Sequence, residues 1–280
     1  MATFVRPVEV IRLSAAGKHT VPDLVAAEEP LEIRLGFGSL AERRQQRLAV
    51  TMRTPGNDFE MVLGFLFTEG IVQSYEQIES IKYCEDVGRQ DEKGNVVRVE
   101  LQVDVRIALV SLQRNFYTTS SCGVCGKSSI AAVRQQCMAM AFSWKIEPDI
   151  IHRLPKKLRQ AQQVFEYTGG LHAAGLFDHA GQLQLVREDV GRHNALDKVI
   201  GAMLVKKSIP LLNHILFVSG RASFELVQKA AVAGIPILAA VGAPSSLAVT
   251  LAKECGMTLL GFVREERFNI YTGIERIILP

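Results

Sequence analysis

The sequence predicts an α/β protein in two parts: a small N-terminal α+β domain and a larger α/β domain with a mostly parallel sheet. Two patterns indicate this class. From residue 168 onward, short apolar runs alternate with segments of helical spacing three times, as in βαβ units. Before residue 108, loosely alternating apolar residues and Gly-rich turns are typical of short strands around a helix. We therefore expect domains at residues 1–108 and 109–280.

The first domain is predicted to contain strands and one helix. Residues 5–53 have the alternation of short strands. Asn57 and Glu60 have the spacing of a capping box, which predicts a helix that ends at Gly70. Two further strands are expected at residues 78–84 and 96–105, with a polar turn between them at residues 91–95. This domain contains no recognisable catalytic constellation.

The larger domain is predicted to contain an amphipathic helix or two at residues 147–167, with basic residues on a solvated face. The later elements follow from apolar runs and glycine stops. Strands are expected at residues 168–177, 183–187, 215–218, 235–241 and 257–263, and helices at 190–205, 222–233 and 245–255. Residues 215–218 are wholly apolar, which favours a strand buried on both faces.

The composition is that of a globular chain with little net charge. The 280 residues carry a net charge of +3, which tolerates an anionic ligand but does not indicate a nucleic-acid partner. Apolar stretches are too short to span a bilayer, and no signal peptide is predicted. The five cysteines show no framework spacing beyond one pair, which favours reduced thiols. We expect a soluble, cytoplasmic protein.

One cysteine pair has the spacing of a reactive site. Cys122 and Cys125 lie two residues apart among small and hydroxylated residues, with Lys127 just beyond. The Cys-x-x-Cys spacing, a nearby cation and a helix N-terminus each lower a thiol pKa and so favour the thiolate. We expect the pair on a mobile loop that leads into a helix at residues 128–136. Half of a zinc site or an incidental pair are the alternatives.

Zinc chemistry does not fit this pair. Four nitrogen or sulfur ligands would be required, and the sequence has no second Cys-x-x-Cys and no His-x₃₋₅-His. A zinc deaminase requires His-x-Glu and Pro-Cys-x-x-Cys. Ser121 stands where that proline would be, and no histidine is followed by x-Glu. We therefore expect no metal.

The ends of the predicted parallel strands suggest an anion site. Ligands of open α/β sheets bind beyond the carboxyl ends of the strands. Those ends are residues 219–223, 242–246 and 264–267. The first two offer hydroxyls and helix N-termini for a phosphate, and Arg221, Arg264 and Arg267 offer guanidinium contacts. Ordinary turns and caps are the alternative for each segment.

Residues 188–198 place many charges at a strand-to-helix turn. His193 and Asp197 are four residues apart on a predicted helix, so they can meet and support acid–base chemistry. A helix cap with an ion-paired surface is the favoured alternative. His172, in a small and apolar strand, is expected to be a satisfied core histidine.

Several motifs together resemble one known family, the formate dehydrogenase accessory sulfurtransferases, also called FdhD. The resemblance runs collinearly from about residue 28 to 275. The matching segments are Cys-Gly-Val-Cys-Gly (122–126), Thr-Gly-Gly-Leu-His-Ala-Ala (168–174), Glu-Asp-Val-Gly-Arg-His-Asn-Ala-Leu-Asp-Lys (188–198), Ser-Gly-Arg-Ala-Ser-Phe-Glu-Leu-Val-Gln-Lys (219–229) and Gly-Phe-Val-Arg (261–264).

The resemblance implies a larger domain similar in fold to cytidine deaminases, without their zinc. It implies a protein that receives persulfide sulfur from a cysteine desulfurase and passes it to the bis(molybdopterin guanine dinucleotide) molybdenum cofactor, for formate dehydrogenase. Cys122 matches the persulfide carrier. The cofactor-binding segment aligns with Phe262, Val263, Arg264, Glu265, Glu266 and Arg267. The family commonly has glycine where this chain has Glu265.

The resemblance therefore predicts that the chain is a sulfurtransferase with Cys122 and Cys125 as its site residues. It also predicts that GDP binds at residues 262–267 as a fragment of the cofactor, and that the chain forms a homodimer. A dithiol–disulfide oxidoreductase is one alternative, since Cys-x-x-Cys alone permits it. A non-catalytic chaperone that only holds the cofactor is another. The sequence leaves open whether Cys125 is a second carrier, a resolving thiol or a neighbour that tunes the pKa of Cys122.

Overall fold

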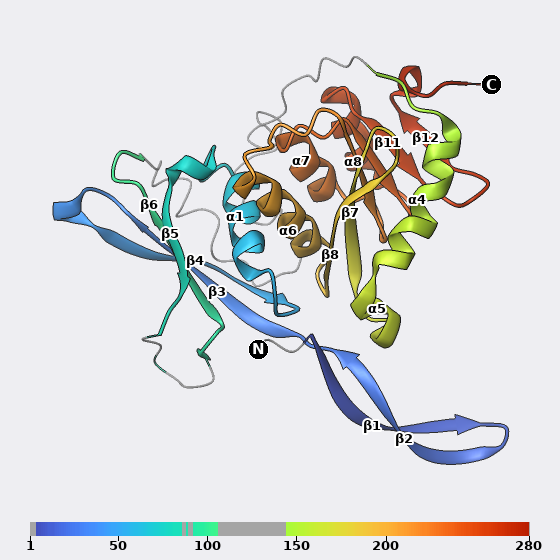
Figure 1. The fold of residues 1–280 in the computed structure, drawn as a ribbon, viewed down its shortest axis with the longest axis horizontal. Helices are drawn as coiled ribbons and strands as arrows, with labels where there is room; N and C mark the ends of the chain where they lie inside the picture. Colours follow the sequence, from blue (N-terminus) through green and yellow to red (C-terminus); the bar gives the residue numbers. More distant parts are fainter. Residues whose placement is uncertain (1–3, 86–87, 89–91, 106–143, 280) are drawn as a thin grey trace.

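A computed structural model describes residues 4–85, 88, 92–105 and 144–279 of the chain (Figure 1). Cys122 and Cys125 lie outside the described residues, as does the expected boundary between residues 108 and 109. The two-domain division therefore stays a prediction. The α/β class is confirmed, because helices cover a central sheet in the C-terminal half.

Within the described residues, the large sheet has six strands in the order β12-β11-β10-β9-β7-β8. The strands are β7 (His172–Asp178), β8 (Leu183–Asp189), β9 (His214–Val218), β10 (Ile237–Ala240), β11 (Thr258–Gly261) and β12 (Asn269–Thr272). Strands β9, β10 and β11 are parallel, whereas β7 runs antiparallel to both of its neighbours and β12 antiparallel to β11. Strand β8 runs in the same direction as β9, β10 and β11, so the expected parallel arrangement is present and only β7 and β12 run the other way.

The physical reason is the tight turn between β7 and β8. Two of the three expected βαβ units pair their strands directly, through the crossover helices α7 (Phe224–Val232) and α8 (Ser246–Glu254). The third runs from β8 through α6 (Arg192–Val205) to β9. Its two strands are parallel to each other but do not pair, because the hairpin partner β7 lies between them.

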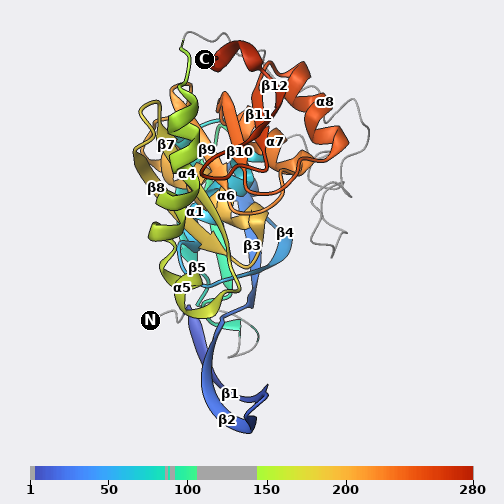
Figure 2. The ribbon, with the colours of Figure 1, turned by 90° about the vertical axis from the view of Figure 1, so that its right-hand side faces the viewer.

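Helices cover the two faces of the large sheet differently (Figures 1 and 2). On one face, α4 (Pro148–Ala161) buries Ile151, Leu154 and Leu158 against strand residues such as Phe217. On the other face lie α6, α7 and α8, whose apolar residues share one cluster with the alternate strand positions. The short helix α5 (Gln163–Thr168) follows α4 and precedes β7.

The N-terminal part has its own sheet, in the order β4-β3-β6-β5. Its elements are β3 (Glu29–Phe37), β4 (Arg44–Arg53), α1 (Asp58–Thr68), β5 (Ile78–Tyr83) and β6 (Val96–Leu101). Helix α1 starts where expected, but without the capping box: Asn57 has a left-handed φ of 55° and its side chain makes no cap bond. Instead, the Asp58 carboxylate accepts a bond from the backbone of Gly56.

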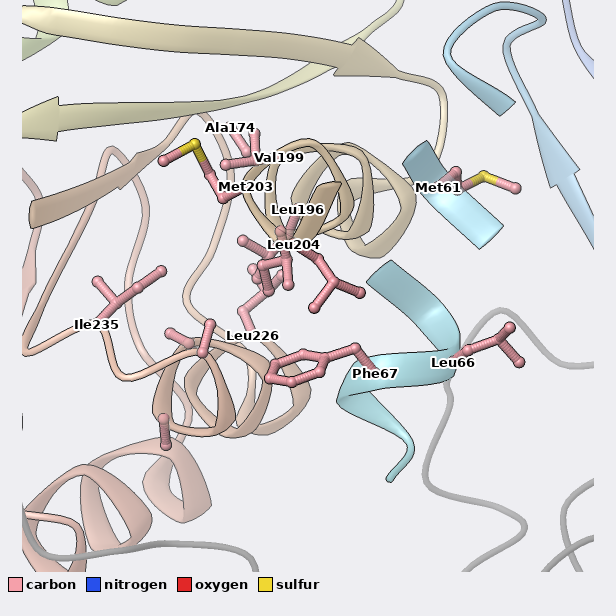
Figure 3. Packing of buried hydrophobic residues seen from close by; sticks show 14 of the residues in the cluster. Met61, Leu66, Phe67, Ala174, Leu196, Val199, Met203, Leu204, Leu226 and Ile235 are labelled. Atoms are coloured by element: carbon pink, nitrogen blue, oxygen red, sulfur yellow. The ribbon is translucent and has the colours of Figure 1, made fainter. Parts of the chain in front are cut away.

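Helix α1 joins the N-terminal sheet to the rest of the protein by packing on α6. A β-carbon added to Gly64 would lie 1.9 Å from the carbonyl oxygen of Asp197, and one added to Gly201 would lie 1.8 Å from that of Glu60. Only glycine permits this approach of two backbones. Figure 3 shows Phe67 of α1 beside Leu226 of α7, and both residues belong to one continuous apolar cluster.

A long hairpin precedes the N-terminal sheet. Strands β1 (Val5–Ser14) and β2 (Gly17–Ala26) pair antiparallel along their whole length. The hairpin projects from the body of the molecule as an arm (Figures 1 and 2). Ile11 and Leu13 near its tip are 62% and 79% exposed, so the arm presents apolar side chains to its surroundings.

Candidate functional site

The carboxyl ends of β9, β10 and β11 meet at one edge of the large sheet, as their parallel pairing requires. The loops that follow them bond directly to one another. The backbone N–H of Gly242 donates to the carbonyl of Gly220 at 2.9 Å, and that of Phe262 donates to the carbonyl of Gly242 at 3.1 Å. The three segments predicted from the strand ends are thus brought together. His172 joins them, because β7 is antiparallel and starts at this edge.

The segment 262–267 forms a surface turn at this edge. Phe262 has a left-handed φ of 53° and a side chain that is 41% exposed. Such a conformation is uncommon for a bulky residue and is found most often at functional sites. Val263 is fully buried in the core below. The backbone N–H of Arg264 donates to the carbonyl of Arg267 at 2.8 Å and closes the turn.

The two arginines of the turn differ in what they can offer a ligand. Nη1 of Arg264 donates to the carbonyl oxygens of Val241 and Val263, at 2.8 Å each. These bonds fix the guanidinium, which has five N–H donors in total. Arg267 is exposed, as are Glu265 and Glu266. Arg264 is exposed as well, but its guanidinium is the one that backbone carbonyls hold in position.

A group of positive charges surrounds His172 at the same edge. Burial lowers the pKa of His172, and the charges of Arg192, His193 and Arg221 lower it further, against an opposing effect of Asp189. His172 is half-buried rather than a fully enclosed core histidine. The imidazole is neutral at neutral pH, while the arginines around it favour an anion.

His193 pairs with residues of another helix rather than with Asp197, the partner that its spacing within one helix allows. Its Nε2 lies 3.0 Å from a carboxylate oxygen of Glu225 and 3.3 Å from the hydroxyl oxygen of Ser223. The hydrogen bond from His193 is the largest cause of a lowered pKa at Glu225. The pairing crosses from α6 to α7, so helical spacing within α6 does not reveal it.

The ion pairs of residues 188–198 lie inside the protein, which corrects the expected ion-paired surface. Asp189 and Lys198 are 0% and 1% exposed, with 2.7 Å between their charged atoms. Asp197 is equally buried and pairs with Lys229 of α7 at 2.9 Å. These residues hold the candidate edge on its supporting helices rather than facing a ligand.

The sequence did not predict a cavity beside this edge, between α4, α5 and the strand ends. Gln162 and Phe165 line it from the helices, and His172, Ser219 and Val241 from the sheet. Nothing in the sequence of residues 147–167 marks a buried glutamine, because Gln162 stands among other glutamines in a polar stretch.

Two of the five cysteines, Cys84 and Cys255, lie in the described residues. Cys84 is a free, partly exposed thiol. Cys255 is fully buried and disulfide-bonded, which corrects the expectation that all five cysteines are reduced. In the described part of the chain, no three His, Cys, Asp or Glu side chains are grouped to hold a metal ion. No helix there has the length and apolar character that a bilayer crossing requires.

Comparison with known proteins gives matches along nearly the whole chain. The profile of the FdhD/NarQ family matches residues 26–278. The sulfur carrier protein FdhD of Streptomyces coelicolor is 49% identical over 275 residues, which is 97% of this chain and 95% of that protein. The protein of the same name from Sulfurisphaera tokodaii is 42% identical over 274 residues, 98% of this chain and 99% of that one.

A solved structure has the same fold. It is the crystal structure of a putative formate dehydrogenase accessory protein from Desulfotalea psychrophila, with a TM-score of 0.76 and 25% sequence identity. The alignment covers 99% of this chain and all of the other.

Proposed function

This chain belongs to the FdhD/NarQ family, and on that premise we propose that it is a cytoplasmic sulfurtransferase that serves formate dehydrogenase. It takes persulfide sulfur from a cysteine desulfurase and delivers it to the bis(molybdopterin guanine dinucleotide) molybdenum cofactor. The observation that carries this proposal is the near-full-length match to relatives that are sulfur carrier proteins. The arginine-bearing sheet edge supports it, since the cofactor is an anionic cargo.

Cys122 is the carrier in this proposal. Its thiolate attacks the outer sulfur of the persulfide on the desulfurase. The sulfur–sulfur bond of that persulfide breaks, the desulfurase cysteine leaves as a thiolate, and Cys122 gains the outer sulfur. Bonds and charges balance without an oxidant or a reductant.

Delivery as sulfide requires two further electrons, and Cys125 is placed in sequence to supply them. Its thiolate attacks the inner sulfur of the Cys122 persulfide, a Cys122–Cys125 disulfide forms, and the outer sulfur leaves as hydrosulfide for the cofactor. A cellular dithiol then reduces the disulfide. Cys125→Ala is expected to load sulfur normally but to release it only when an external thiol is added.

The cargo binds, in this proposal, at the edge formed by residues 262–267. Arg264 is held by two backbone carbonyls, so its remaining N–H donors are oriented before a phosphate arrives. Phe262, strained and exposed, offers an aromatic ring at the same turn. A guanine nucleotide such as GDP is the fragment of the cargo that suits this edge.

A transfer assay tests the proposed function. The chain is loaded with ³⁵S from a desulfurase and labelled cysteine, separated from the desulfurase, and mixed with the purified cofactor and apo formate dehydrogenase. Label is expected in the cofactor, together with formate oxidation, for the wild type but not for Cys122→Ala. A chaperone that only holds the cofactor would activate the client equally well in both forms.

We also propose that two copies of the chain pair through the β1–β2 arm. An isolated two-stranded hairpin is only marginally stable in water, and Ile11 and Leu13 leave this one with exposed apolar side chains. A second copy would cover them. Light scattering is expected to give a dimer mass for the wild type and a monomer mass for Leu13→Asp; a monomeric wild type would contradict this.

A further inference from the structure

Helix α4 carries a concentration of positive charge. Its 14 residues include four cationic side chains and one carboxylate, Asp149. With His152 neutral, the helix therefore has a net charge of +3, which equals the net charge of the whole chain. The remaining residues together carry no net charge, so the excess positive charge of the protein lies on one helix. The cations are Arg153, Lys156, Lys157 and Arg159.

The apolar side of α4 is already used by the fold. Ile151, Leu154 and Leu158 are buried against the large sheet. Figures 1 and 2 show α4 along one face of that sheet, with α6, α7 and α8 on the other. The outer side of α4, which includes Arg153 and Lys156, is exposed. Because a helix binds a membrane surface by burying its apolar side, α4 is left with charge as its means of recognising a partner.

Two of the four cations are free to bind such a partner. Arg153 and Lys156 form no ion pair or side-chain hydrogen bond with any described residue, whereas Arg159 pairs with Glu166 at 3.6 Å. Lys157 donates to oxygen atoms of the turn between β7 and β8. Arg153 and Lys156 are three residues apart, so their side chains lie on the same side of the helix and repel each other. A carboxylate from outside the chain would remove that repulsion.

Helix α4 lies beside the turn that is proposed to bind the cargo. Nδ1 of His152 lies 3.3 Å from the carbonyl oxygen of Arg264, and the ring centres of His152 and Phe268 are 5.2 Å apart. Further along the helix, Leu158 lines the same cavity as Val241, which follows β10. The two free cations stand between these contacts in sequence. The helix therefore presents its charge next to the cargo edge.

We propose that the outer side of α4 docks an acidic surface of the client enzyme, formate dehydrogenase. The inference rests on the proposed function, because cargo held at the turn passes to the client only when the client lies against this edge. Carboxylates of the client pair with Arg153 and Lys156. Charge complementarity of this kind speeds association and fixes the orientation of two proteins more than it adds affinity. Sulfur loading does not involve the cargo, so it does not require this surface.

Charge reversal in Arg153→Glu/Lys156→Glu tests the inference. Biolayer interferometry with immobilised apo formate dehydrogenase and the full chain is expected to give about tenfold weaker binding for this variant, chiefly through slower association. Arg153→Ala/Lys156→Ala removes the charges without reversing them and is expected to weaken binding about threefold. Added salt is expected to weaken wild-type binding more than that of either variant, because salt screens exposed charges. Equal affinities for all three proteins would overturn the inference.

A matched control makes the same change of charge on the other face of the sheet. Lys206 follows α6 and Lys253 lies in the last turn of α8, and both are exposed. Lys206→Glu/Lys253→Glu is expected to bind the client as the wild type does. If both charge reversals weaken binding equally, the effect comes from total charge and the inference fails. The melting temperatures of both variants are expected to equal that of the wild type, since exposed substitutions change stability little.

Carbodiimide cross-linking locates the contact directly. The reagent joins a lysine amine to a carboxyl group that it touches, through an amide bond. Peptide mass spectrometry of the cross-linked complex is expected to show Lys156 joined to a carboxylate of the client. Cross-links through Lys206 or Lys253, with none through Lys156, would contradict the proposed surface.

Two further measurements separate this inference from the proposed function. Sulfur loading by the desulfurase, followed by intact mass, is expected to be equal for the wild type and Arg153→Glu/Lys156→Glu. If the variant loads less sulfur but binds the client normally, this surface serves the desulfurase, and the inference fails while the proposed function stands. If the wild type acquires no sulfur, the proposed function fails. Wild-type binding to anionic lipid vesicles, lost in the variant while client binding is unchanged, would also overturn the inference.

Discussion

Replacement of Asp189 by asparagine tests whether the buried charges below the sheet edge support the fold. Oδ2 of Asp189 lies 2.7 Å from Nζ of Lys198 and accepts a bond from the backbone of Thr54 at 3.1 Å. Oδ1 accepts from the backbone of Gly191 at 2.8 Å and from Nδ2 of Asn194 at 3.0 Å. Each oxygen thus faces two donors. Whichever way an asparagine amide is oriented, its NH₂ group faces two donors and bonds are lost.

The loss of charge adds to the loss of bonds. In Asp189→Asn, Lys198 keeps the carbonyl oxygens of Thr54 and Glu188 as partners, at 2.9 and 3.2 Å, but no other carboxylate of the described residues lies within ion-pair distance. Removal of one partner from a buried ion pair costs about 3–5 kcal/mol. Because folded domains are stable by only about 5–15 kcal/mol, this single change is expected to remove a large share of the stability.

Urea unfolding followed by circular dichroism measures this loss. In the double variant Asp189→Asn/Lys198→Met, only the part of the loss that comes from the unpaired buried charge is expected to be recovered, because the lost hydrogen bonds of Asp189 and Lys198 are not restored. Glu76→Gln is the matched exposed control: its partner Lys207 is 64% exposed, and the midpoint is expected not to move. A loss below about 1 kcal/mol in Asp189→Asn, the size of an average substitution, would mean that this buried ion pair does not support the fold.

Three further predictions concern packing, pH and the cargo edge. Gly64→Ala is expected to destabilise the chain by about 2 kcal/mol or more, because its β-carbon would meet the Asp197 carbonyl at 1.9 Å; an unchanged thermal midpoint would contradict the packing of α1 on α6. The pKa of His172 is lowered in the folded state, so its contribution to stability is present above about pH 6.5 and is lost as the pH falls through the folded pKa. In His172→Asn the free energy of unfolding is therefore expected to depend less on pH in this range. An equal pH dependence in the variant and the wild type would contradict this prediction. Arg264→Ala and Arg267→Ala are each expected to weaken GDP binding about tenfold, the effect of one charged hydrogen bond. Glu265→Gly is expected to leave the affinity for GDP equal or higher. If calorimetry gives the same affinity for both arginine variants as for the wild type, this edge is not the phosphate site.

Local patterns predicted most elements because those elements depend on local physics. The helix that ends near Gly70 and the apolar strand at residues 215–218 both follow from burial and periodicity, and both are present as α1 and β9. The sheet edge was likewise predictable, since parallel strands with crossover helices bring their carboxyl ends together. Strand β12 (Asn269–Thr272) was missed, because it is short, only partly buried and polar at both ends.

What the sequence could not show depends on contacts between distant segments. The direction of β7 is decided by its pairing with β8 and β9, which no local pattern encodes, so its antiparallel place between them was not foreseen. His193 has a plausible partner four residues away but pairs with Glu225 on another helix. Gln162 has no distinguishing neighbour in sequence, and only the junction of α4 with α5 buries its amide.

Intact-mass spectrometry of the chain after incubation with a cysteine desulfurase and cysteine is the most direct test of the proposed sulfur transfer. The wild type is expected to gain about one sulfur atom, which a reductant removes. Cys122→Ala is expected not to acquire this sulfur, whereas Arg264→Ala is expected to retain it. A loss of only two protons, as in disulfide formation between two cysteines, would contradict the sulfur carrier and identify a dithiol–disulfide oxidoreductase instead.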